Sequence, residues 1–360
     1  MNTENCPEVD PRVDPQVDPI DPTNAELLDV FWGHPRLREN LWQISAGAPT
    51  ATVETMDGKF AVPTAQALAF ASIRSHCNGH NGARRIAERS GTPLADVVSM
   101  LAALTDAGLM LGDDADEAQP PTLARVRDRL ERACAAWSRA LNRAFVANEL
   151  IDGTLPKTVL TGWLIEMYHY VRDFPEAIAS AAGRADGELA ELLERYVGQE
   201  RGHENFVLQT LVNIGLDTDE VRSSQPLVST RLIGLLMREL FALAPESVLL
   251  VAALVEAHDM APDQMNEFQG LLERTYQLPA GAMQPYFRHQ AIDAALGHSQ
   301  LLADNLHLFK VSERALLDQI VNKLHDLKHA FELQSHEIKM YYGELGGKYF
   351  PRQPMTFSAL

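Results

Sequence analysis

The chain has 360 residues, a hydrophobic content of 46% and a formal net charge of −18. This length is typical of two domains, whereas so acidic a chain lacks the basic face that a nucleic-acid-binding protein needs. No apolar run is long enough to span a membrane, so we expect neither a membrane nor a nucleic-acid partner. The three cysteines are too widely spaced for a zinc module and suggest a reducing compartment, so we expect a cytoplasmic protein.

The first 24 residues repeat the triplet Val-Asp-Pro and end near Asp21-Pro22. Proline at this density blocks helices and sheet pairing, and the aspartates repel one another. We therefore predict a disordered, solubilising tail over residues 1–24.

Residues 25–111 have the pattern of a small α+β domain. Two strand-like runs between Ala51 and Pro63 flank Asp57-Gly58, which is a hairpin signal. Three helices follow, at about 64–75, 83–89 and 93–107, and residues 108–110 return as a strand. This order of elements is that of a winged helix.

The same region resembles the peptide-chaperone domain of pyrroloquinoline quinone biosynthesis and related leader-peptide recognition domains. The matching residues are Asp57-Gly58, Arg85-Ile86-Ala87, Leu101 and Gly108-Leu109-Met110. The resemblance implies that a precursor peptide or carrier protein docks at a sheet edge. DNA binding is disfavoured because the helix at 93–107 has no lysine or arginine, and a purely structural appendage is the other alternative.

An acidic stretch ending in Pro120-Pro121 predicts a linker over residues 112–121. Beyond it, residues 122–360 show helical periodicity throughout, with short gaps at Gly, Pro or Asp, and no strand candidate. The expected helices lie near 122–149, 156–183, 187–214, 229–243, 246–259, 262–276, 283–306 and 311–342. The fold class predicted from this pattern is mainly α.

Three of these helices carry acid and imidazole groups at helical spacing. Glu200 and His203 are about 60° apart on one helix, and His289 and Asp293 are one turn apart. Glu256 stands in a nearly uniform apolar run, where a carboxylate needs a cation or a hydrogen-bond partner. Each motif has a simpler explanation, a surface pair or a helix end, but together they are typical of an iron or manganese site.

The chain from about residue 158 to residue 305 resembles a family, the heme-oxygenase-like diiron oxidases. The matches are Tyr168-x-Tyr170 before Phe174-Pro175, Glu200-x-x-His203 before Gly215-Leu216, Glu256, and Tyr286-Phe287-x-His289-x-x-x-Asp293. The resemblance implies a heme-oxygenase-like helical bundle that binds two Fe(II) ions per chain. It assigns Glu200, His203, Glu256 and His289 to the first iron and Asp293 to the second.

One position departs from the family pattern, which continues Asp-x-x-His. That last position is Leu296 here, and His298 follows two residues later. On a regular helix His298 points roughly opposite to His289, so it reaches the site only if the helix unwinds, which Gly297 would permit. Without His298 as a ligand, the second iron is weakly held or the site is mononuclear.

A second Glu-x-x-His motif, Glu166 and His169, lies on the preceding helix and makes a ferritin-like bundle the alternative fold. In the preferred fold we expect Glu166 and His169 to line the substrate pocket. We expect Tyr168 and Tyr170 to take part in catalysis with Glu200. The simpler interpretation is a core tyrosine and a surface histidine.

Together these features predict a homodimeric nonheme diiron oxidase or oxygenase with O2 as co-substrate. The resemblance implies an amino acid, peptide or carrier-linked substrate in a biosynthetic pathway. The alternatives are a cofactor-independent oxidase of the same superfamily and an inactive peptide-binding adaptor.

Overall fold

The structure is a computed structural model, which describes residues 35–37, 40–43, 48–55, 58–106, 109–110, 121–256, 260–344 and 350–359. Contacts divide the chain into two units, residues 1–116 and 117–360. The division falls inside the stretch that the sequence predicts as a linker. The predicted tail, residues 1–24, lies outside the described part of the chain.

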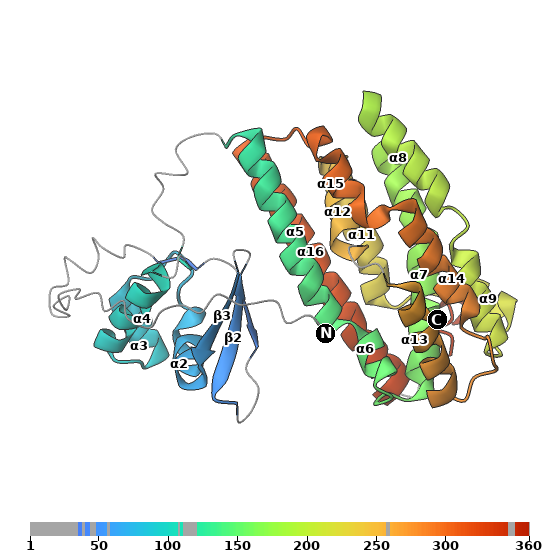
Figure 1. Cartoon of the computed structure of the whole chain (residues 1–360), viewed down its shortest axis with the longest axis horizontal. Helices are drawn as coiled ribbons and strands as arrows, with labels where there is room; N and C mark the ends of the chain where they lie inside the picture. The colour runs from blue at the N-terminus through green and yellow to red at the C-terminus, as the bar shows by residue number, and fades with distance from the viewer. Residues whose placement is uncertain are drawn as a thin grey trace. The chain divides into compact units, whose positions relative to one another are not determined.

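The first unit consists of a small antiparallel sheet and three helices (Figure 1). The strands are β1 (Asn40–Gln43), β2 (Thr50–Thr55) and β3 (Gly58–Pro63), and β2 is the central one. The helices are α2 (Thr64–Arg74), α3 (Ala83–Ser90) and α4 (Leu94–Asp106). The expected strand pair and helices are therefore present, and β1 was not foreseen.

This unit has its own apolar core. Phe70 and Ile73 of α2, Ile86 of α3 and Leu101 of α4 are all buried in it. The expected last strand is reduced to an isolated bridge between Leu37 and Met110. The winged-helix class and the peptide-recognition role stay predictions.

The second unit is helical (Figure 1). Its longer helices are α5 (Leu123–Ala144), α7 (Lys157–Ala182), α8 (Gly187–Glu200), α9 (Glu204–Asn213), α11 (Val228–Leu243), α12 (Ser247–Val255), α13 (Pro262–Thr275), α14 (Gln284–Leu296) and α16 (Arg314–Ile338). Shorter helices are α6 (Val146–Ile151), α10 (Thr218–Ser223) and α15 (Leu301–Asn305).

Helix α7 is the central element of this unit. It packs against α8, α9 and α11, and its residues Leu160, Leu164 and Ile165 are fully buried. A helix that is apolar on most sides must be enclosed by others, because each exposed side would leave apolar surface in water. No helix in the described parts of the chain is both long and apolar enough to cross a membrane.

Three of the expected helices are broken, which corrects the sequence-based boundaries. The helix predicted over 187–214 stops at Glu200 and resumes at Glu204, because Gly202 has a φ of 91°. The helix predicted over 283–306 stops at Leu296, where Gly297 has a φ of 75°. The helix predicted over 122–149 breaks at Phe145, which is extended. A left-handed glycine ends a helix readily because it has no Cβ to clash.

Candidate metal centre

Polar side chains at the ends of several helices lie close together at one place in the second unit. Glu200 is the last residue of α8 and His203 is the residue before α9. Glu256 follows the last residue of α12, and His298 follows Gly297 at the end of α14. Helix ends have backbone freedom that helix interiors lack, so these side chains can turn toward a common centre.

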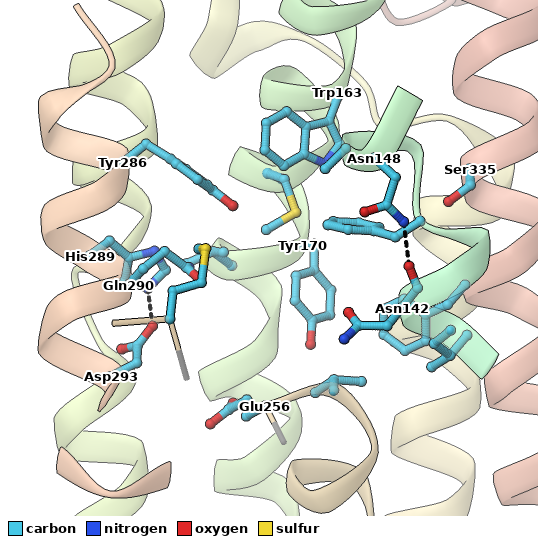
Figure 2. Close-up of a pocket in the computed structure, with 18 of the residues that line it drawn as sticks. Asn142, Asn148, Trp163, Tyr170, Glu256, Tyr286, His289, Gln290, Asp293 and Ser335 are labelled. Atoms are coloured by element: carbon cyan, nitrogen blue, oxygen red, sulfur yellow. Dashed lines mark hydrogen bonds and ion pairs between the residues drawn. The ribbon is translucent and has the colours of Figure 1, made fainter. Parts of the chain in front are cut away.

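The first group of ligand-type atoms joins α9 to α14. His203 Nδ1 lies 3.1 Å from His289 Nε2 and 3.2 Å from Asp293 Oδ1. His289 Nε2 lies 3.0 Å from Asp293 Oδ2, one turn along the helix. Figure 2 shows His289 and Asp293 side by side on α14, facing the pocket. The three side chains are close enough to hold one ion.

The second group contains His298, which the sequence had left in doubt. His298 Nδ1 lies 3.1 Å from Glu200 Oε1 and 3.1 Å from Glu256 Oε2. Its distance to Asp293 Oδ1 is 4.0 Å. Glu200, Asp293 and His298 can hold a second ion, and Asp293 belongs to both groups.

The grouping differs from the one that the family resemblance implied. Glu256 was expected beside His203 and His289, but it lies against His298 instead. Glu200 faces both groups, since its Oε2 is 3.6 Å from His203 Nδ1. Leu296, at the family's histidine position, is 41% exposed.

Several ligand-type atoms of this cluster lack hydrogen-bond partners. Glu200 Oε1, Glu256 Oε2, Asp293 Oδ1 and His298 Nδ1 are all buried without a hydrogen bond of acceptable geometry. Buried polar atoms of the described residues that converge on one another but bind nothing have the arrangement of metal ligands. The residues therefore fit a metal site.

The electrostatics of the cluster favour a cation. Burial favours the neutral imidazole of His298, but Glu200 and Glu256 outweigh it and raise the pKa of His298 to about 10. Burial lowers the pKa of His289 to about 4, so that ring is neutral near pH 7 and offers a lone pair. The negative carboxylates thus stabilise a positive charge beside them, which a proton on His298 or a metal ion supplies.

Two supporting residues on α8 escaped the sequence analysis. Tyr196 Oη donates a 2.6 Å hydrogen bond to Glu256 Oε1, and Gln199 Oε1 lies 3.3 Å from His298 Nε2. These hydrogen bonds orient the side chains of Glu256 and His298, as residues that surround the ligands commonly do at metal sites. Helical spacing could have indicated Tyr196, because it stands one turn before Glu200 and faces the same side of the helix.

A cavity of about 640 Å³ adjoins the cluster. Its wall includes Glu200, Glu256, His289, Asp293 and His298 at one end, and many apolar side chains beyond them. Figure 2 shows Tyr170 in the middle of this pocket, with its hydroxyl group directed toward Glu256. Burial and the nearby carboxylates raise the pKa of Tyr170 well above its usual value, so the phenol keeps its proton.

The other predicted pocket residues lie elsewhere, which corrects the expectation for them. Glu166, Tyr168 and His169 do not line this cavity. Glu166 is fully buried and accepts hydrogen bonds from Tyr342 Oη at 2.8 Å and from the Leu227 amide at 2.9 Å. His169 Nε2 lies 2.9 Å from Ser224 Oγ. Glu166 and His169 thus tie α7 to neighbouring segments instead of lining the cavity.

Comparison with known proteins shows what part of the helical unit is similar to. Residues 161–327 match the model of a family described as iron-containing redox enzymes. A solved structure from Shewanella denitrificans, described as a domain of unknown function with a heme oxygenase-like fold, is 19% identical. It covers 66% of this chain and 100% of its own, with a TM-score of 0.47. No curated protein matches the chain.

Residues 161–327 are therefore similar to iron-containing redox enzymes. The predicted fold class, a mainly α protein with a heme-oxygenase-like bundle, is confirmed, and the ferritin-like alternative is set aside. The family match supports a general redox role and suggests iron as the metal. It does not extend to the first unit, so nothing supports the winged-helix or peptide-recognition prediction.

Proposed function

We propose that this protein is a nonheme diiron oxidase or oxygenase that uses O2 to oxidise an organic substrate bound in the cavity. The observation that carries the proposal is the pair of ligand groups that share Asp293. Histidine and carboxylate sets of this kind suit ferrous iron and leave positions open for other ligands.

The proposal assigns the six side chains to two ions. His203 and His289 would hold one, Glu256 and His298 would hold the other, and Asp293 and Glu200 lie close enough to both groups to serve both. Two ferrous ions would supply two of the electrons that reduce O2. The protein would bind the substrate next to them and keep bulk water away with its apolar wall.

Anaerobic titration with Fe(II) tests this proposal. We expect the wild-type chain to bind two iron ions, and His203→Ala to bind at most one, because the variant removes one ligand of a three-residue group. His307→Ala is the matched control, since His307 is 55% exposed in its side chain and pairs with Glu188 outside the cluster. O2 uptake by the loaded proteins is measured afterwards.

Each outcome has a distinct meaning. Two ions in the wild type and in the control, with fewer in His203→Ala and O2 uptake that follows the iron content, support the proposal. One ion in the wild type would replace the diiron site by a mononuclear one. No bound iron would sink the metal hypothesis and favour the cofactor-independent oxidase or the adaptor.

A further inference from the structure

The wall of the cavity contains a buried hydrogen-bond donor that the metal cluster does not use. Trp163 of α7 lines the cavity and is 3% exposed. Its indole Nε1 is buried and has no hydrogen-bond partner among the described residues. A buried donor that is left unpaired loses its hydrogen bonds to water without replacement, so a buried indole N–H without a partner needs an explanation.

Packing holds the indole ring of Trp163 in place. The rings of Phe145 and Tyr286 meet it edge to face, with centroids 5.9 Å and 5.2 Å away. All three residues line the cavity. Because two aromatic rings hold the indole in place, the direction of its N–H group is fixed before any ligand arrives, which favours selective binding.

Trp163 lies at a distance from the metal cluster. In Figure 2 it stands at the opposite side of the pocket from Glu256 and Asp293, with Tyr170 between them. Asn142, which is exposed, also lines the cavity.

The charges of the wall limit what this part of the cavity can bind. Outside the cluster, the charged residues that line the cavity in the described part of the chain are Arg143 and Glu332. Arg143 is exposed, and Glu332 is paired with Lys328 at 3.1 Å and with His329 at 2.8 Å. A charged group beside Trp163 would therefore have no buried counter-charge outside the cluster.

We propose that Trp163 forms a subsite that donates its indole N–H to a neutral oxygen acceptor, such as a carbonyl oxygen, on an otherwise apolar substrate. The substrate class is thus an uncharged, largely apolar molecule with one acceptor placed away from the reacting end. This inference rests on the proposed function in taking the cavity as the substrate site.

Three probes of the same shape test the subsite. They are 2-acetylnaphthalene, which carries a carbonyl acceptor, 2-ethylnaphthalene, which lacks it, and the anion 2-naphthoate. Binding to the full chain is measured by calorimetry, under nitrogen, with and without Fe(II). We expect the ketone to bind about five to ten times more tightly than the hydrocarbon, in line with one hydrogen bond to a buried donor. In the iron-free protein we expect the ketone to bind more tightly than the anion.

The decisive variant is Trp163→Phe, which keeps an aromatic ring and removes the N–H group. We expect it to reduce the preference for the ketone to less than about twofold while the hydrocarbon binds as before. Trp137→Phe is the matched control, because Trp137 is also 3% exposed but does not line the cavity. That control keeps the preference for the ketone.

The result separates this inference from the proposed function. A preference for the ketone that survives in Trp163→Phe, equal binding of ketone and hydrocarbon, tighter binding of the anion to iron-free protein, or no binding of any probe would overturn the subsite. Iron content is measured on the same samples. An intact diiron site without the ketone preference rejects the subsite alone, and a ketone preference without bound iron rejects the diiron proposal alone.

Discussion

At the scale of single residues, two Glu-x-x-His motifs of the same spacing have different roles. Glu166 and His169 lie inside the continuous helix α7, and their polar atoms contact Tyr342, the Leu227 amide and Ser224. Glu200 lies at a helix break and its Oε1 has no hydrogen-bond partner. The local sequence is similar, so the available partners decide which motif is structural and which suits a metal.

The buried Glu166 makes the stability of the fold depend on pH. Burial raises the pKa of Glu166 from 4.5 to about 7 in the folded protein. Hydrogen bonds from Thr230, Leu227 and Tyr342 lower this pKa, but the effect of burial is larger. The folded state therefore favours the protonated acid. This stabilisation is fully present below the unfolded pKa and is lost as the pH rises through about 7.

The variant Glu166→Gln isolates this effect, since the amide cannot ionise. Between about pH 5 and about pH 8 we expect the free energy of unfolding of the wild type to fall by about 3 kcal/mol relative to the variant. Urea unfolding of iron-free protein measures it. Glu176→Gln, an exposed site on the same helix, should track the wild type. If Glu166→Gln also tracked the wild type, Glu166 would not be held as the acid.

At the scale of elements, interruptions of helices build the metal site. Glu200, His203, Glu256 and His298 all stand at helix ends, and only His289 and Asp293 lie within a helix. Gly297 is the interruption with the clearest consequence. Its left-handed conformation turns the chain so that His298 becomes 2% exposed and faces Glu200.

The variant Gly297→Ala tests this turn. A Cβ at residue 297 would meet nothing within 4 Å, so the cost of about 1 kcal/mol is that of the left-handed backbone alone. We expect the variant to bind the second iron ion more weakly while the first is retained, because His298 shifts. The measurement is the same anaerobic Fe(II) titration.

Gly91→Ala is the matched control, since Gly91 also ends a helix with a φ of 69° and nothing within 4 Å of its Cβ position. It should lose similar stability in the first unit and keep both iron ions. Unchanged affinity for the second ion in Gly297→Ala would mean that the turn does not position a ligand.

At the scale of the helical unit, the end of the chain returns to its middle. Tyr342 is fully buried against α7, donates its hydroxyl hydrogen to Glu166, and packs on Gly162. Further along, the carbonyl oxygen of Arg352 accepts a 2.8 Å hydrogen bond from the Gln225 amide. These contacts join segments that are more than a hundred residues apart, so they contribute only once the bundle is assembled.

Gly162→Ala is expected to disturb this closure. The added Cβ would overlap the ring of Tyr342, and overpacking of this kind typically costs about 1–3 kcal/mol. Gly198→Ala, on an exposed position of α8 with nothing within 4 Å, should instead gain about 0.5–1 kcal/mol from helix propensity. Denaturant unfolding compares the stability of the two variants. If Gly162→Ala were as stable as the wild type, the ring of Tyr342 could move aside at little cost.

The sequence by itself determined the helical class, most helix positions and the types of ligand. Apolar periodicity and the acid and imidazole residues at Glu200, His203, Glu256, His289 and Asp293 are local features, readable without knowing which helices touch. The length of continuous helix was less accessible, because Gly202 and Gly297 are tolerated within a helix and end it only where the surroundings favour the turn.

Only the tertiary structure decided how these parts combine. It placed His298 beside Glu200 and Glu256, moved Glu256 away from its expected partners, and gave Glu166 a structural role through Tyr342. It also left the indole N–H of Trp163 without a partner in the cavity wall. Each outcome depends on groups brought together from distant parts of the chain, whose burial and hydrogen bonding arise only when the helices pack.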